Sequence, residues 1–111
     1  MDLNDEITRE LERALQARTR GNEGQARVCA RRAAGIAARD FLARRGSPPR
    51  TSSAYDLLKL LAEDIALPAA IQERAAILTL RVDEEFKLPP GVDLIAEARL
   101  LCESLLASPP N

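Results

Sequence analysis

The fold of this chain is decided by residues 25–45, QARVCARRAAGIAARDFLARR. This stretch is rich in Ala, has one Gly and contains no Pro, so it strongly favours a helix. At 3.6 residues per turn, one side of that helix carries a wide apolar stripe. The members of the stripe are Ala26, Cys29, Ala30, Ala33, Ile36, Ala37 and Phe41. A second apolar strip contains Val28, Ala38 and Leu42. Because two sides are apolar, we predict a central helix that neighbours cover on both sides.

One further helix is expected before the central one. Apolar residues spaced by three and four positions predict a helix from Asp2 or Asn4 to about Arg20. The turn Gly21–Gly24 follows, and its Gly and Asn residues tolerate the positive φ of a tight turn. The first two helices are therefore expected to run antiparallel.

A third helix is expected after a linker. The linker Ser47–Ser53 contains two Pro and cannot continue a helix. Ser53, with Asp56 three residues on, is typical of a capping pair and predicts a helix over Ala54–Ala66. The residues predicted to be buried on this helix are Tyr55, Leu58, Leu61, Ala62 and Ile65.

Two more helices are expected in the rest of the chain. Pro68 suits the first position of a fourth helix, whose apolar face contains Ile71, Ala75, Leu78 and Val82. Residues 83–87 either extend that helix or fray, and residues 88–91 break the chain. Asp93 is then expected to cap a last helix of about 14 residues.

These elements define one fold class. The composition is 46% hydrophobic but only 3% aromatic, so Leu, Ile and Ala must form the core. Such a core favours helix-on-helix packing over a β-sandwich. We predict that residues 1–111 form a single all-α domain, an antiparallel up-and-down bundle of five helices with a central Ala-rich second helix.

The sequence also carries expectations about location. No apolar run approaches the roughly 20 residues of a membrane-spanning helix, and no signal peptide is recognisable. We expect a cytoplasmic protein with no membrane partner. In that compartment Cys29 and Cys102 are expected to be reduced, buried thiols.

Charge is distributed unevenly and gathers on the central helix. Residues 1–50 have 11 basic and 7 acidic side chains, net +4, whereas residues 51–111 have 5 and 10, net −5. Arg27, Arg31, Gly35 and Arg39 share one polar face, with Arg32 on its flank. These four Arg residues are candidates for binding an anion or nucleic acid, because guanidinium groups suit phosphates. Ion pairs within the fold or a dimer, and simple solvation, stay open as alternatives.

The second apolar strip is the candidate dimer interface. A monomer of five helices need not cover Val28, Ala38 and Leu42, and two-fold dimers are the commonest oligomers. We therefore expect a homodimer that buries this strip. The alternative is that the fifth helix of the same chain covers it.

No catalytic or metal-binding constellation can be assembled from the sequence. The chain has no His and two widely separated Cys, so a zinc site is not expected. No activated nucleophile or phosphate-binding glycine loop is recognisable. The carboxylates of residues 83–85 are typical of a solvated helix end. We expect no cofactor, no metal and no enzymatic activity.

The helical hairpin at the start of the chain resembles that of a known family. The segment from Ala14 through the turn at residues 21–24 to Ala37, with its regularly spaced Ala residues, is similar to the opening hairpin of HEPN domains. Tyr55-Asp56-Leu57 lies where that family usually has a helix opening near His-Asp-Leu. The resemblance spans about residues 3–106. It implies a small helical bundle from a toxin–antitoxin system, or the partner of a nucleotidyltransferase.

The sequence departs from the active members of that family. HEPN ribonucleases resemble one another in an Arg followed, after four to six residues, by a His. Arg81 is a possible remnant of this motif, but Phe86, Lys87 and Leu88 occupy the candidate His positions. The resemblance therefore implies a non-catalytic interaction module. Two alternatives are an RNA- or nucleotide-phosphate-binding protein that uses the Arg face, and an adaptor similar to tetratricopeptide hairpins, although the repeat of about 34 residues is absent.

Overall fold

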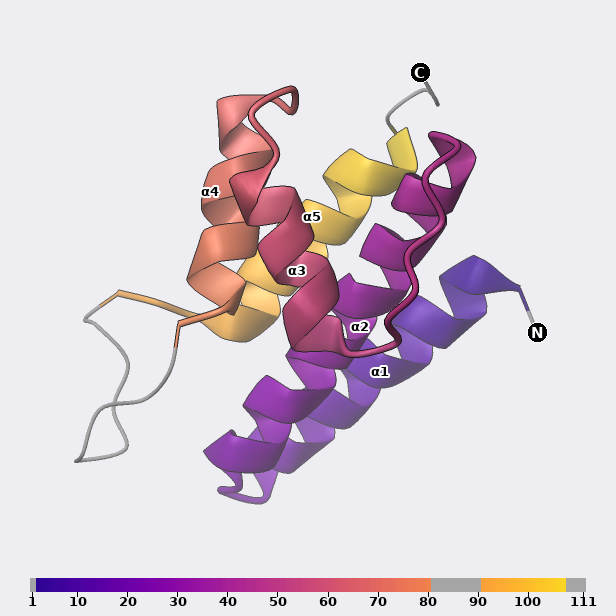
Figure 1. Ribbon diagram of the computed structural model, residues 1–111. Coiled ribbons are helices and arrows are strands. Elements are labelled where there is room, and N and C mark those ends of the chain that lie inside the picture. The colour runs from indigo at the N-terminus through magenta and orange to yellow at the C-terminus, as the bar shows by residue number, and fades with distance from the viewer. Residues whose placement is uncertain (1, 81–90, 108–111) are drawn as a thin grey trace.

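The computed structural model describes residues 2–80 and 91–107, which form five helices and no strand (Figure 1). The helices are α1 (Leu3–Thr19), α2 (Glu23–Arg44), α3 (Ala54–Glu63), α4 (Ala69–Leu78) and α5 (Leu94–Ala107). The all-α prediction is confirmed for these residues. The expectations about residues 83–87 and about Arg81, Phe86, Lys87 and Leu88 lie outside the described residues.

The α1–α2 hairpin forms as its turn residues predict. The backbone N–H of Asn22 donates to the carbonyl of Ala17 at 2.8 Å, and Gly21 adopts a φ of +80°. Gly21 therefore ends α1 in the left-handed backbone conformation, which Gly adopts without a steric penalty. The side chain of Asn22 then caps α2 by accepting from the backbone N–H of Gln25 at 3.0 Å. As a result, α1 and α2 pack against each other along their length.

Helix α2 is central, as its two apolar sides predict. It packs against α1, α3 and α5, and Figure 1 shows it between these neighbours. Its buried residues are Ala26, Cys29, Ala30, Ala33, Ala34, Gly35, Ala37, Ala38, Phe41 and Leu42. Most of them are small, so neighbouring backbones can approach α2 closely. The larger side chains of the core come from the other helices, such as Leu57 and Leu61 of α3 and Leu101 and Leu105 of α5.

The directions of the helices differ from a simple up-and-down bundle. Ala54, at the start of α3, lies against Gly35 in the middle of α2. Asp64, just after α3, forms an ion pair with Arg45, just after α2, at 3.3 Å. Helices α2 and α3 therefore run in the same general direction, because the linker 45–53 returns the chain along α2 (Figure 1).

Helix α5 also runs in the direction of α2. Asp93, before α5, pairs with Arg18 beside the start of α2, whereas Arg44, at the end of α2, donates to the carbonyl of Leu105 at 2.9 Å. The expected strict alternation of five helices is therefore wrong. Antiparallel packing holds for the α1–α2 hairpin.

The third helix differs from its predicted bounds. It ends at Glu63 rather than Ala66, because the side chain of Asp64 accepts from the backbone N–H of Ala66 at 2.9 Å and turns the chain. Ile65 lies beyond the helix and is 94% exposed, so its predicted burial is wrong. Leu57, which the predicted stripe omits, is buried instead.

An ion-pair network fastens the α1–α2 turn to α5. The guanidinium of Arg18 donates to Glu23 at 2.6 Å and to Asp93 at 3.1 Å. Asp93 also caps α5 by accepting from the backbone N–H groups of Ile95 and Ala96. The hydrogen bonds from Arg18 lower the pKa of the Asp93 carboxyl, and the pKa of Arg18 is raised, first by Glu23 and then by Asp93.

The lowered pKa of Asp93 predicts a pH dependence of stability. A carboxyl whose folded pKa is depressed stabilises the fold above its ordinary pKa of about 3.9, and this contribution is lost as the pH falls below it. Asp93→Asn keeps the cap acceptor and removes the charge. Urea unfolding between pH 3 and pH 7 should show wild type more stable than the variant at pH 7, with the difference shrinking as the pH falls below about 3.9. A difference that does not change with pH would contradict the assignment.

Candidate anion-binding groove

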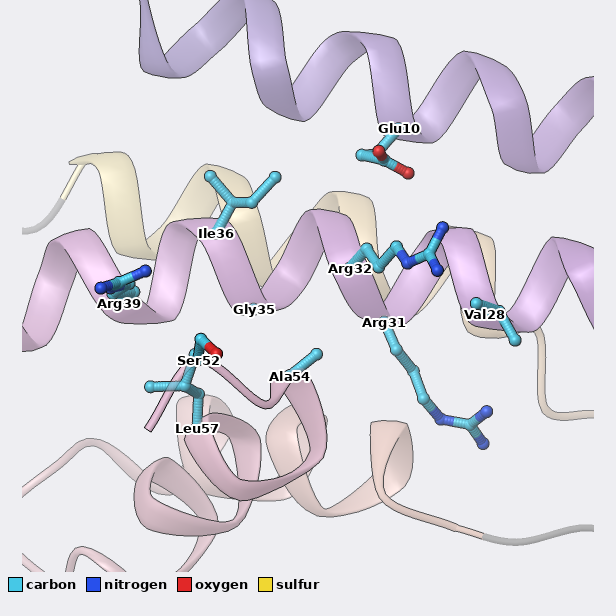
Figure 2. Close-up of a pocket in the computed structure, with 10 residues that line it drawn as sticks. All are labelled: Glu10, Val28, Arg31, Arg32, Gly35, Ile36, Arg39, Ser52, Ala54 and Leu57. Atoms are coloured by element: carbon cyan, nitrogen blue, oxygen red, sulfur yellow. The ribbon is translucent and has the colours of Figure 1, made fainter. Parts of the chain in front are cut away.

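The central helix contributes one wall of a groove of about 440 Å³. Helix α1 contributes Glu10, and the end of the linker and the start of α3 contribute the opposite wall (Figure 2). The lining residues are Glu10, Val28, Arg31, Arg32, Gly35, Ile36, Arg39, Ser52, Ala54 and Leu57. The structure thus brings three of the four predicted Arg residues into one site.

Arg32 and Arg39 are the available cations of the groove. Both are exposed, and neither makes a hydrogen bond or ion pair within residues 2–80 and 91–107. They lie seven residues apart on α2, so about 10.5 Å of helix separates them. Figure 2 shows them on either side of Gly35. The groove therefore offers two separate guanidinium groups to a ligand.

Arg31 has a different role from the one predicted for the Arg face. Its guanidinium donates to the carbonyls of Leu78 at 2.8 Å and Leu80 at 2.6 Å. These carbonyls lie at the end of α4, where the last turn of a helix leaves acceptors without partners. Arg31 thus fixes α4 to α2 at one end of the groove (Figure 2), through backbone carbonyls and not through the carboxylates that the ion-pair alternative named. Arg27 is half-buried and does not line the groove.

The floor of the groove is apolar and tightly packed. Ile36, Ala54 and Leu57 line it together with the backbone at Gly35. A Cβ atom on Gly35 would lie 2.8 Å from the Cβ of Ala54, so α2 and α3 approach as closely as Gly allows. Gly35 is therefore buried where α2 and α3 cross. The prediction that it belongs to the polar face of the central helix is wrong. The N-terminus of α3 at this crossing adds partial positive charge to the site.

Glu10 supplies a carboxylate that the sequence analysis missed. One of its oxygens, Oε1, accepts from Arg13 at 3.0 Å. The other, Oε2, is buried and has no hydrogen-bond partner among the described residues. A buried acceptor without a partner costs free energy, so a ligand donor that reached it would be favoured. Figure 2 shows Glu10 on the α1 wall, opposite α3.

The predicted dimer strip divides into exposed and buried residues. Val28 is 38% exposed and lines the groove. Ala38 is fully buried and Leu42 is 9% exposed within the single chain, so the expectation that they need a second copy to cover them is wrong. Leu42 lines a hollow together with Pro49 of the linker and Leu60 of α3.

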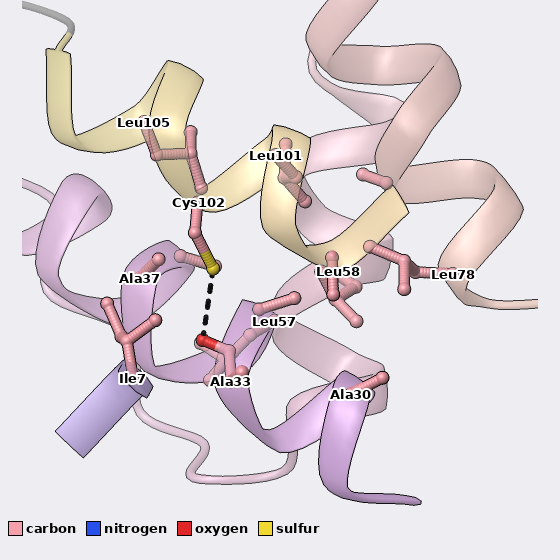
Figure 3. Close-up of a cluster of buried hydrophobic side chains, with 14 of the residues drawn as sticks. Ile7, Ala30, Ala33, Ala37, Leu57, Leu58, Leu78, Leu101, Cys102 and Leu105 are labelled. Carbon is pink, nitrogen blue, oxygen red and sulfur yellow. Dashed lines mark hydrogen bonds between the residues drawn. The ribbon is translucent and has the colours of Figure 1, made fainter. Parts of the chain in front are cut away.

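The two cysteines are structural. Both are free and buried, as expected. The thiol of Cys102 donates to the carbonyl of Ala33 at 3.5 Å, which links α5 to α2 (Figure 3). Burial raises the pKa of Cys102 to about 12, with a smaller contribution from Glu103, so its reactive thiolate is rare at neutral pH.

Within the described ranges, no group of three or more Cys, Asp or Glu side chains is placed to hold a metal ion. None of the helices in the same ranges is both long and apolar enough to cross a bilayer. Comparison of the chain with models of protein families, with curated proteins and with solved structures gave no match. The inference about function therefore depends on the groove.

Proposed function

We propose that this protein is a non-catalytic, HEPN-like helical interaction module that holds an acidic, amphipathic segment of a partner protein in the groove. One observation carries the proposal: Arg32 and Arg39 lie unpaired, among the described residues, along an apolar groove. Guanidinium groups bind carboxylates through paired N–H donors, and an apolar floor between them takes an apolar side chain. The module is proposed to be a homodimer whose partner is a nucleotidyltransferase or toxin–antitoxin component, as the resemblance implies.

The spacing of the two cations defines the ligand. The separation of about 10.5 Å along α2 matches two acidic residues seven positions apart on a helical segment. An apolar residue midway between those acids would lie over Ile36 and Leu57. Such a helix in a groove uses the same recognition mode as many amphipathic partner helices.

RNA or a nucleotide phosphate is the second candidate, and the groove favours it less. None of the described residues that line the groove is aromatic, so a base has no ring to stack on. The net charge of −1 gives no general attraction to nucleic acid. A tetratricopeptide-like adaptor is also less favoured, because α2 and α3 do not run antiparallel as stacked hairpins require.

The lack of catalysis is proposed on chemical grounds. The chain contains no His, so the imidazole of the HEPN ribonuclease motif has no counterpart. Among the described residues that line the groove there is no His, Cys or Lys, and the carboxylate of Glu10 and the hydroxyl of Ser52 come from different elements, α1 and the linker before α3. Binding is therefore the activity to measure.

A designed peptide tests the proposal. The probe is a fluorescent helical peptide of about 14 residues with two Glu seven positions apart and a Leu between them on the same face. We expect saturable binding, weakened about tenfold by Arg32→Glu or Arg39→Glu, since each change removes one charge-assisted contact worth about 1.4 kcal/mol.

Two controls make the result decisive. Arg20→Glu makes the same change at an exposed position outside the groove and should leave binding unchanged. A labelled single-stranded RNA should bind more weakly than the peptide. Equal losses for Arg20→Glu and Arg32→Glu would overturn the groove as the site. RNA binding that exceeds peptide binding and falls steeply with salt would replace the proposed ligand by nucleic acid.

A further inference from the structure

The outward face of α5 is unusually apolar for an exposed helix surface. Its exposed residues are Ala96, Arg99, Leu100, Glu103, Leu106 and Ala107. Four of these six are apolar, and Leu100 and Leu106 are 41% and 36% exposed. The buried residues of α5 lie on its other side, so burial within the chain does not account for these Leu residues. An apolar helix face of this kind is a candidate interaction surface.

The apolar surface continues from α5 onto α1. A hollow of about 450 Å³ lies between the two helices. Leu11 and Leu15 of α1 and Leu106 of α5 line it, and Leu15 is 42% exposed. Helices α1 and α5 also contact each other directly. The face is therefore wider than one helix and can accept a helix of a partner.

The charged residues on the exposed face of α5 are complementary to the same face of a second, antiparallel copy. Arg99 and Glu103 lie one turn apart on the exposed face, and neither has an ion pair in the described parts of the chain. Consider two copies of α5 that pack antiparallel through their exposed faces, with the two-fold axis at the level of residue 101 along the helix. Arg99 then faces the partner's Glu103, and symmetry creates a second, identical pair. In the same register Leu106 faces the partner's Ala96, a large side chain over a small one. A two-fold axis requires such self-complementarity.

We propose that the α5 face, with the adjoining part of α1, binds the same face of a second copy of this chain. We assign the face to a second copy because the residues around the hollow include both acidic and basic side chains, Glu12, Arg99 and Glu103. Glu12 and Glu103 would repel the acidic segment proposed for the groove, and Arg99 alone would hold an anionic surface weakly. This interface rests on the homodimer of the proposed function, but the face shares no residue with the groove lining, so peptide binding in the groove and dimerisation through α5 can fail separately.

Charge-reversal variants of the 111-residue chain test the interface. Sedimentation velocity from about 1 to 500 μM should show a concentration-dependent dimer. Arg99→Glu places like charges opposite each other at two positions and should weaken dimerisation at least tenfold. The double variant Arg99→Glu/Glu103→Arg restores opposite charges across the axis and should recover the dimer. Arg50→Glu, at an exposed linker position, is the matched control and should dimerise as wild type does.

Each outcome decides the proposal. Circular dichroism first establishes that every variant has wild-type helix content. A wild-type monomer at all concentrations would overturn the interface, and so would an Arg99→Glu variant that dimerises as well as wild type. Loss of the dimer in Arg99→Glu without recovery in the double variant would overturn the antiparallel pairing. Recovery supports it, because opposite charges then face each other again across the axis.

Discussion

Replacing Gly35 by Ala will lower the free energy of unfolding, although Gly-to-Ala changes inside helices normally raise it. A Cβ at this position would lie 2.8 Å from the Cβ of Ala54 and 3.0 Å from its Cα. The obstacle is a helix backbone, which cannot rotate away as a long side chain can. Overpacking of this kind costs about 1–3 kcal/mol, which exceeds the roughly 1 kcal/mol that Ala gains in helix propensity. Gly35→Leu should cost more, because it forces α3 further from α2.

Gly24→Ala is the matched control for this prediction. Gly24 lies in the first turn of the same helix, and a Cβ there would meet nothing closer than 3.8 Å. Urea unfolding followed by circular dichroism should therefore show Gly24→Ala as stable as wild type or more stable. The crossing of α2 and α3 would be looser than described if Gly35→Ala were stabilised to the same extent as the control.

Replacing Arg31 by Met will destabilise the fold by about 3 kcal/mol, since two hydrogen bonds from a charged group are lost. Met retains much of the aliphatic packing of Arg but cannot donate to the carbonyls of Leu78 and Leu80. Both acceptors lie at the end of α4, which has no other basic side chain in its last turn. The loss should be local first, so amide hydrogen exchange near the end of α4 should accelerate before global unfolding does.

Arg32→Met tests whether the effect is specific to Arg31. The two residues are adjacent on α2, but Arg32 is exposed and has no partner among the described residues. Its replacement should change the free energy of unfolding by less than about 0.5 kcal/mol. Similar losses for both variants would indicate that the charge of the Arg face, rather than the contact with α4, stabilises the fold.

Local features of the fold were predictable from the sequence. Gly21 specifies the turn between α1 and α2 through its positive φ, and the side chains of Asn22 and Ser53 cap α2 and α3. The burial of α2 followed from its apolar periodicity. Each of these features depends on residues a few positions apart, which periodicity and capping rules describe.

Features set by distant contacts were not predictable in the same way. The direction of α3 depends on the route of the linker, and linker composition does not fix a route. The role of Arg31 depends on acceptors 47 and 49 residues away. The exposure of Ile65 depends on where Asp64 ends the helix, a shift of a few residues at a boundary.

Glu10 illustrates a signal that was present but was not used. It lies three residues after Ile7 and four before Ala14, both of which are buried on α1. A Glu at a position on the apolar side of an amphipathic helix is uncommon, and its placement at the wall of the groove accounts for it.

The position of α5 in the bundle bears on how the chain folds during synthesis. Helix α5 packs against α1, α2 and α4, and it contributes buried Leu94, Leu101 and Leu105. Before residues 94–107 leave the ribosome, the earlier helices can form. The apolar surfaces of α1, α2 and α4 that pack against α5 in the folded chain are then still exposed to water. Nascent chains halted before residue 94 should therefore be degraded by proteases or bound by chaperones. Chains in which residues 94–107 have also left the ribosome should resist proteolysis.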